Sequence, residues 1–303
     1  MPHAAGAYAF AMPANLYALG AIALWASVAS LGVSLSHVPP FLLTGVALLV
    51  GSLLSLPSVL RDRRQWRIPA STLLLGVYGL FGFHFLFFIA LRHAPPVEAN
   101  LVNYLWPLFI VVLAPLFLRG IHLRTVHVAA ALLGFAGAAI AILGSGNGVQ
   151  GGGWSWGYLP ALGSAFIWAS YSLLTKRIAP FPTAAIGLFG LVSGLLSLLC
   201  HWALEPSVVL SGRDGLLLAV MGLGPLGAAF FLWDKALKLG DARQIGILSY
   251  LTPLGSTALL MLVSGRALTW SLGLAAAMII GAAVLGTRAP AKAYAPPRRG
   301  PKS

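Results

Sequence analysis

Charged side chains are scarce in this sequence of 303 residues. Asp, Glu, Lys and Arg make up 8% of the chain, 59% of the residues are hydrophobic, and the mean hydropathy is +0.89. Soluble domains carry about 25% charged residues, so this scarcity excludes an ordinary soluble domain. Apolar runs of about 20 residues can each cross a bilayer as a helix, and no stretch alternates like a strand of a membrane β-barrel. The sequence therefore predicts an all-α polytopic membrane protein.

Cysteine is nearly absent, and so are the common motifs of catalysis. The single cysteine, Cys200, excludes an intramolecular disulfide. The chain contains no GxxxxGK[ST], no HExxH and no CxxC motif. The glycine cluster at 144–153 lacks the lysine of a phosphate-binding loop, so we interpret it as a linker. We expect no enzyme activity, no catalytic residue, no cofactor and no metal site.

Acidic residues are the scarcest charged type, and each lies at a predicted helix end or in a loop. The six are Asp62, Glu98, Glu205, Asp214, Asp234 and Asp241. Proton- and sodium-coupled carriers normally place a carboxylate near the middle of the membrane. We therefore expect no coupling through a buried carboxylate, which leaves His84 as the candidate for proton coupling or else simple equilibration of the substrate.

Basic residues are in excess, with 19 Lys and Arg and a net charge of +13. They sit in short loops and in a tail, where they orient a membrane protein, so we expect no nucleic-acid partner. Ten apolar segments can be delimited, at about 14–35, 41–60, 69–91, 98–118, 124–144, 157–176, 183–203, 213–237, 243–264 and 268–287. With a cytoplasmic N-terminus, 16 of the 19 basic residues lie inside and only Arg92, Arg213 and Arg266 lie outside. This predicts ten transmembrane helices with both termini cytoplasmic.

The two halves of the chain resemble each other. "ALRHAPPVEANLVNYLWPL" at 90–108 matches "ALKLGDARQIGILSYLTPL" at 236–254 with an offset of 146, and "ALWAS" at 23–27 matches "FIWAS" at 166–170 with an offset of 143. Because five helices per half is an odd number, the halves must have opposite orientations, as in many secondary transporters. We predict a 5+5 inverted-topology repeat. Its parts are residues 14–144, a Gly-rich periplasmic linker at 145–156, residues 157–287, and a disordered basic tail at 288–303.

Polar residues and a proline share one face of the fourth predicted helix. Asn100, Asn103, Tyr104 and Pro107 are spaced i, i+3, i+4 and i+7. An amide facing lipid is costly, so this face should point inward, toward substrate or toward another helix. The ninth predicted helix repeats this spacing 146 residues later, at Gly246, Ser249, Tyr250 and Pro253. Pro107 and Pro253 each remove a backbone hydrogen bond and are candidate hinges, or only structural bends.

Aromatic and titratable residues lie deep inside other predicted helices. Trp25 and Trp168 are matched by the repeat and lie away from the membrane interfaces where tryptophan is usually found. They could form a pocket with Tyr171 or simply pack in the core. His84 lies in the middle of the third predicted helix, with Tyr78 near the same stripe. An intramembrane histidine is a functional candidate, although a neutral ring bonded to a neighbouring helix is the alternative.

Three strings resemble a known family. "NYLWP" at 103–107, "GSAFIWASYSLLTKR" at 163–177 and "SYLTP" at 249–253 are similar to the YddG-type aromatic amino-acid exporters, in the EamA group of the drug/metabolite transporter (DMT) superfamily. The resemblance covers essentially all ten predicted helices. It implies a 5+5 fold in a bacterial inner membrane and efflux of aromatic amino acids. It also implies a central cavity lined by the first, third, fourth, sixth, eighth and ninth helices.

Together these patterns predict a monomeric, multi-pass secondary transporter of the bacterial inner membrane, surrounded by lipid, that exports aromatic and other neutral amino acids by alternating access. The predicted substrate-binding residues are Trp25, Tyr78, His84, Asn103, Tyr104, Trp168, Tyr171, Ser249 and Tyr250, and the predicted hinges are Pro107 and Pro253. The alternatives are a DMT-type carrier of a drug cation, purine or sugar, and a membrane scaffold or receptor that transports nothing.

Overall fold

The computed structural model describes residues 13–144, 154–263, 265 and 269–287. The predicted tail at 288–303 and most of the predicted linker at 145–156 lie outside these residues. Every regular element within the described residues is helical, as expected for apolar chain in lipid, where a helix satisfies its own backbone groups.

Helices occupy all ten of the predicted ranges. Their bounds are α1 (Ala14–Ala26), α2 (Val28–Ser34), α3 (Pro40–Ser52), η1 (Leu53–Ser55), α4 (Leu56–Arg61), η2 (Arg63–Trp66), α5 (Ala70–Val77), η3 (Tyr78–Gly82), α6 (Phe83–His93), α7 (Pro96–Asn103), α8 (Trp106–Phe117), α9 (Thr125–Leu143), α10 (Tyr158–Arg177), α11 (Ala185–Leu204), α12 (Gly212–Leu223), η4 (Gly224–Ala228), α13 (Ala229–Leu239), α14 (Ala242–Leu248), α15 (Leu251–Val263) and α16 (Trp270–Thr287).

Eight helical segments among the described residues are long and apolar enough to cross a membrane. They are Ala14–Ser34, Pro40–Arg61, Ala70–His93, Pro96–Phe117, Thr125–Leu143, Ala185–Leu204, Gly212–Leu239 and Ala242–Val263. The apolar stretch of α16 is shorter, at Trp270–Gly286. The predicted class, a polytopic helical membrane protein, is confirmed.

Two of these segments are broken at matching positions. The break between α7 and α8 falls at Tyr104–Leu105, and the break between α14 and α15 falls at Ser249–Tyr250, so the two are 145 residues apart, one less than the offset of the sequence repeat. Pro107 and Pro253 lie in the first turn of the second half-helix in each case. Because proline has no amide hydrogen, it leaves the carbonyl four residues earlier without a helical partner, which favours a break there.

Two further segments contain a π-helical turn in the middle. These turns are η3 and η4, which begin at Tyr78 and Gly224, again 146 residues apart. A π-helical turn inserted in an α-helix is frequent at functional sites.

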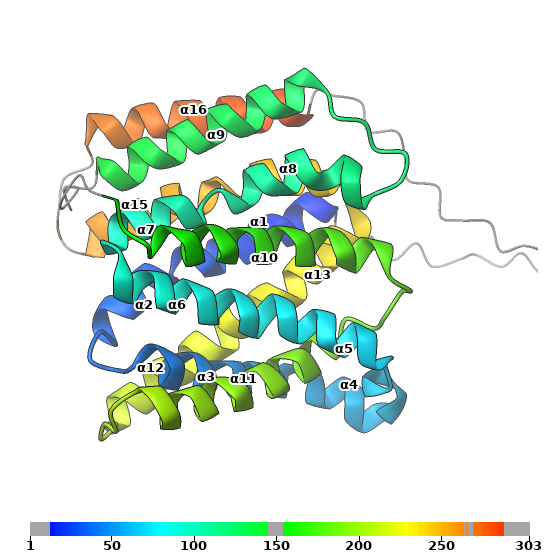
Figure 1. The fold of residues 1–303 in the computed structure, drawn as a ribbon, viewed down its shortest axis with the longest axis vertical. Coiled ribbons are helices and arrows are strands. Elements are labelled where there is room, and N and C mark those ends of the chain that lie inside the picture. The colour runs from blue at the N-terminus through cyan, green and yellow to red at the C-terminus, as the bar shows by residue number, and fades with distance from the viewer. Residues whose placement is uncertain (1–12, 145–153, 264, 266–268, 288–303) are drawn as a thin grey trace, which may run out of the picture.

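Helices from the first and second half of the chain pack against one another throughout. Figure 1 shows α9 beside α16 at one edge of the bundle and α3 beside α11 at the opposite edge. Between these edges, α1 packs on α13 and α15, while α10 packs on α6 and α8. Close approach of α3 to η4 requires glycine, since a Cβ at Gly51 would lie 2.8 Å from the Gly227 Cα. The core therefore lies between the two halves.

Candidate functional site

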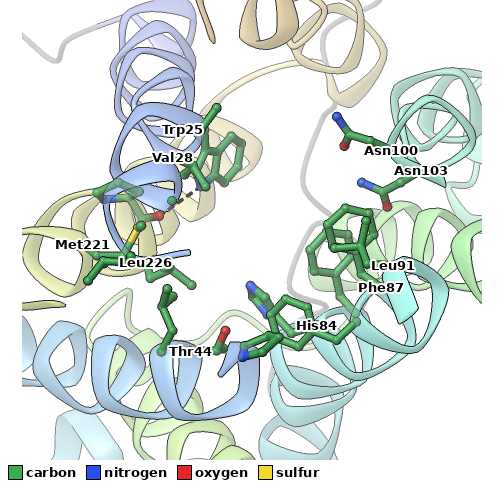
Figure 2. Close-up of a pocket in the computed structure, with 18 of the residues that line it drawn as sticks. Trp25, Val28, Thr44, His84, Phe87, Leu91, Asn100, Asn103, Met221 and Leu226 are labelled. Carbon is green, nitrogen blue, oxygen red and sulfur yellow. Dashed lines mark hydrogen bonds between the residues drawn. The ribbon is translucent and has the colours of Figure 1, made fainter. Parts of the chain in front are cut away.

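A cavity of about 530 Å³ lies among the helices at the centre of the bundle. Figure 2 shows its labelled side chains arranged around an open space. Its lining is mostly apolar and comes from α1, α2, α3, α6, α7, α8, α10, α12, η4, α13 and α15, so the second predicted helix contributes in addition to those that the resemblance implied. The residues are Trp25, Val28, Ala29, Gly32, Leu35, Ser36, Val38, Pro40, Leu43, Thr44, Phe83, His84, Phe87, Phe88, Leu91, Asn100, Asn103, Tyr104, Trp106, Trp168, Met221, Pro225, Leu226, Phe230 and Thr252.

Five aromatic rings pack together at this cavity, and all of them except Trp233 line it. We refer to them as the tryptophan cluster: Trp25, Trp106, Trp168, Phe230 and Trp233. The ring centroids of Trp25 lie 5.8 Å from Trp168 and 6.5 Å from Trp106, in T-shaped geometry. Trp25 and Trp233 are 5.2 Å apart. The cluster joins rings from four helices, α1, α8, α10 and α13, which belong to both halves of the chain.

Two of the indole N–H groups of this cluster have hydrogen-bond partners within the protein. Trp25 Nε1 donates to the Pro225 carbonyl oxygen at 3.1 Å, where the π-helical turn of η4 exposes that carbonyl. Trp233 Nε1 donates to Ser172 Oγ at 3.2 Å. Because its donor is satisfied within the protein, Trp25 offers the apolar face and edge of its ring to a ligand.

Asn103 forms a polar point on the cavity wall. Its Oδ1 lies 2.8 Å from Ser164 Oγ, and the Ser164 hydroxyl is shared with the Ala161 carbonyl oxygen at 2.7 Å. The residue is 5% exposed and Ser164 is fully buried on α10. With Oδ1 held by Ser164, the amide NH₂ is the end left for the cavity.

His84 forms a second polar point, on α6. Its Nδ1 lies 2.6 Å from the Leu80 carbonyl oxygen, so Nδ1 carries a proton and donates. In the neutral ring, Nε2 is then an acceptor. The imidazole packs edge-on against Phe83 at 5.0 Å and Phe230 at 6.4 Å, which fixes the orientation of the ring.

No Asp, Glu, Lys or Arg is among the described residues that line the cavity. The site is therefore uncharged when His84 is neutral. Its chemistry is limited to ring contacts, amide and hydroxyl hydrogen bonds and one imidazole acceptor. Such a site can bind and orient a solute of zero net charge, and it offers no nucleophile paired with a base.

Five of the nine predicted substrate-binding residues line the cavity: Trp25, His84, Asn103, Tyr104 and Trp168. Asn100, which shares the predicted polar face, also lines it. The aromatic wall of Phe83, Phe87 and Phe88 was not predicted, although "GFHFLFF" at 82–88 places Phe83 and Phe87 one helical turn apart.

Tyr78 and Tyr171 lie outside this cavity. The Tyr78 hydroxyl is 2.8 Å from Ser170 Oγ, which links α10 to the start of η3. Tyr171 packs on Trp168 at 5.4 Å, and its ring presses on Gly79, where a Cβ would lie 2.3 Å away. Both tyrosines therefore lie where η3 meets α10, beyond the cavity wall.

Ser249 and Tyr250 also lie outside the cavity. Ser249 Oγ donates to the Ile245 carbonyl oxygen of its own helix at 2.8 Å. The Tyr250 ring is fully buried against α9, 6.5 Å from Phe135 and in contact with Gly134, where a Cβ would lie 2.4 Å from the ring. Tyr250 thus turns toward α9, and Thr252 is the residue of the ninth predicted helix that lines the cavity.

Beyond the tryptophan cluster, lysines hold α10 and α13 together, and we call this the closed end. Lys176 Nζ donates to the carbonyl oxygens of Leu237 and, at 2.8 Å, Gly240, which are left without helical partners where α13 ends. Lys238 Nζ on α13 donates to the Phe181 carbonyl oxygen, in the connection after α10, at 2.8 Å. It also donates to Asp234 Oδ2 on its own helix at 2.6 Å.

The opposite end of the cavity reaches the connection at 35–39, and we call it the open end. Here the buried Glu205 carboxylate accepts the amide N–H groups of Phe41 and Leu42 at the start of α3, at 3.0 and 3.2 Å. It also lies 2.9 Å from Arg92 on α6 and 2.9 Å from His201 on α11. These bonds hold α3, α6 and α11 together beside the cavity.

Comparison with known proteins identifies relatives over nearly the whole chain. The model of the EamA-like transporter family matches twice, at residues 12–143 and 155–288. The aromatic amino acid exporter YddG of Ancylobacter novellus is 40% identical over 287 residues, which is 90% of this chain and 96% of that protein. The YddG exporter of Salmonella typhimurium is 30% identical over 281 residues, 88% of this chain and 94% of that protein. A crystal structure of a protein with 40% identity aligns with a TM-score of 0.83, covering 90% of this chain and 97% of that one.

Proposed function

The chain belongs to the EamA-like transporter family, and we propose that it exports aromatic and other neutral amino acids across the bacterial inner membrane. The observation that carries this proposal is the uncharged, ring-lined cavity at the centre of the bundle. An amino-acid zwitterion has no net charge, and an aromatic side chain finds tilted and T-shaped partners in the tryptophan cluster. The names of the exporters described above support the same substrate class.

Asn103 and His84 would bind the two charged groups of the substrate. The Asn103 amide NH₂ is a donor suited to the carboxylate, and His84 Nε2 is an acceptor suited to the ammonium group. Neutral dipoles bind a zwitterion without a charged partner that would have to be desolvated. This arrangement supports modest affinity and broad selectivity among neutral amino acids. It favours them over a drug cation, for which a carboxylate would be expected.

The proposed topology has ten transmembrane helices, with α10 and α16 added to the eight spans described above. Residues 14–144 and 157–287 form two halves of opposite orientation, joined by a periplasmic linker at 145–156 and followed by a cytoplasmic tail at 288–303. The matched breaks and π-helical turns support this arrangement, and so does the double match to the family model. Because 16 of 19 basic residues fall on one side, both termini are cytoplasmic and the open end is periplasmic.

Alternating access follows from this topology. The cavity reaches the periplasmic side, while the tryptophan cluster and the lysine bonds of the closed end block the cytoplasmic side. The breaks before Pro107 and Pro253 and the turns η3 and η4 are where half-helices can tilt, because backbone hydrogen bonding is interrupted or altered there. We propose that the protein works as a monomer surrounded by lipid.

A flux assay in liposomes tests this function. Purified protein should exchange labelled tryptophan, tyrosine, phenylalanine and leucine. It should do so without a pH gradient, because no carboxylate is found among the described residues of the cavity wall. Asn103→Leu should weaken apparent affinity by about ten- to a hundred-fold, the effect of losing about 1.5–3 kcal/mol for a hydrogen bond to a charged group.

Ser193→Ala is the matched control for a buried polar deletion. Ser193 Oγ is buried on α11, makes no hydrogen bond within the described residues and does not line the cavity. This variant should transport like the wild type. If the wild type moves none of these amino acids, or if Asn103→Leu behaves like Ser193→Ala, the proposed substrate site is wrong.

Cysteine labelling tests the topology. In a background lacking Cys200, a membrane-impermeant reagent added from the periplasmic side should modify Val209→Cys, which is 96% exposed, and spare Gln65→Cys. The reverse pattern would require the opposite orientation.

A further inference from the structure

Thr252 carries a buried hydroxyl that makes no hydrogen bond in this structure. The residue is 6% exposed and lines the cavity from α15, yet its Oγ1 is shielded from solvent and has no partner within the described residues. Of the other two hydroxyls at this break, Ser249 Oγ bonds to its own helix, and that of Tyr250 belongs to a residue that does not line the cavity. A buried polar group without a partner is costly, so Thr252 is unusual in this wall.

The position of Thr252 relates it to the ring-binding part of the cavity. It is 146 residues after Trp106, so it is the counterpart in the second half of a ring in the tryptophan cluster. Its helix, α15, packs on α1, which carries Trp25, and on α2. The groups proposed to hold the zwitterion, Asn103 and His84, come instead from α7 and α6. Thr252 is therefore placed on the side of the substrate's aromatic ring.

A threonine in a helix adopts either of two χ1 rotamers. A change of rotamer moves the hydroxyl to a different position around the Cα–Cβ bond, without any movement of the backbone. The Thr252 hydroxyl can both donate and accept, so it suits a phenol O–H or an indole N–H equally well.

Building on the proposed export function, we propose that Thr252 is a specificity-determining residue that hydrogen-bonds the polar group on the ring of tyrosine or tryptophan. A phenylalanine ring leaves the hydroxyl unpaired in an apolar wall. Sites built to bond a substrate O–H or N–H discriminate strongly against analogues that lack it. The site thus has a higher affinity for tyrosine and tryptophan than for phenylalanine, because one hydroxyl bonds only the first two.

The test compares Thr252→Val with Thr252→Ser in liposome exchange of labelled tyrosine, tryptophan and phenylalanine. Valine keeps the shape and removes the hydroxyl, so the preference for tyrosine over phenylalanine, taken as the ratio of apparent affinities, should fall about three- to ten-fold. Serine keeps the hydroxyl and should retain the preference. Thr175→Val, whose hydroxyl bonds the Ser172 carbonyl oxygen of its own helix, controls for the substitution itself and should transport like the wild type.

The outcomes separate this proposal from the export function. An unchanged preference in Thr252→Val, or an equal loss for all three substrates, overturns the role of Thr252 while leaving export intact. A wild-type protein that moves none of the three overturns export itself. If Thr252→Val does not fold, two other measurements test the proposal. Thr252→Ser must keep the wild-type preference, and O-methyltyrosine is used as a competitor. Its methylated phenol oxygen cannot donate a hydrogen bond, so it should compete less well than tyrosine.

Discussion

The closed end and the open end are built from different bonds. At the closed end, Lys176 connects α10 to the end of α13, and Lys238 connects α13 to the connection that follows α10. At the open end, Glu205 connects α3, α6 and α11, which lie together on one side. The bonds at the closed end therefore join helix ends, whereas those at the open end hold the start of α3 to two neighbouring helices.

The sequence offsets explain why the two ends differ. Lys238 corresponds to Arg92, which bonds Glu205 instead of a carbonyl across the cavity, and Lys176 corresponds to Val33, which is 63% exposed and has no charge. The open end therefore lacks the counterpart of one of the two lysines. A few polar residues at the helix ends therefore distinguish the two ends, although the helix breaks and π-helical turns recur in both halves.

The largest expected effect is the loss of Glu205. Glu205→Ala removes the acceptor of two backbone amides and the partner of Arg92, and should lower the free energy of unfolding by about 3 kcal/mol. Its counterpart 143 residues earlier, Asp62, is exposed and only caps Arg64, so Asp62→Ala should cost far less. Melting curves in detergent measure both. Equal losses would show that the open end is not stiffened by Glu205.

Lys176 carries the next largest effect. Lys176→Met removes the charged bonds to the Leu237 and Gly240 carbonyls, worth about 1.5–3 kcal/mol. The population open to the cytoplasm should rise about ten- to a hundred-fold. Labelling of a cysteine placed at Ser172, beside Trp233, would detect this rise. Arg177→Met, an exposed neighbour without an ion pair in the described residues, should leave labelling unchanged and serves as the control.

A smaller effect is expected from adding the missing lysine. Val33→Lys gives the open end the counterpart of Lys176, so it should favour closure of that end and slow the labelling of a cysteine in the cavity by a few-fold. Val33→Met, with similar length and no charge, should not. Faster labelling in Val33→Lys than in Val33→Met would contradict the view that helix-end lysines set the bias.

The smallest effect concerns pH. Burial by itself raises the pKa of Asp241, but hydrogen bonds from the Arg243 side chain and backbone outweigh it, so the pKa lies below its ordinary value. A lowered pKa stabilises the fold above the ordinary value of about 3.9, and the contribution is lost only as pH falls through the folded-state value. The destabilisation caused by Asp241→Asn should therefore be the same at pH 6 and pH 8. The melting temperatures of the wild type and of Asp241→Asn measure this destabilisation. A difference between the two proteins that changes from pH 6 to pH 8 would contradict the prediction.

Much of the fold follows from local properties of the sequence. The apolar runs determined where the helices lie, because a membrane segment must satisfy its own backbone, and the observed bounds differ from the predicted ones by only a few residues at most ends. The prolines at 107 and 253 indicated the interruptions, because a missing amide acts on the same helix. The tryptophans at 25 and 168 were identified as cavity candidates because they lie away from either helix end.

The neighbours of each helix face were decided only by the tertiary structure. Tyr104 and Tyr250 occupy the same place in matching sequence strings, yet Tyr104 lines the cavity and Tyr250 is buried against Gly134 on α9. Helical spacing specifies which residues share a face, but the partner of that face depends on how ten predicted segments pack together. The sequence by itself thus determined the class, the helices and the polar faces, whereas packing between distant segments decided which of those faces meet in the cavity.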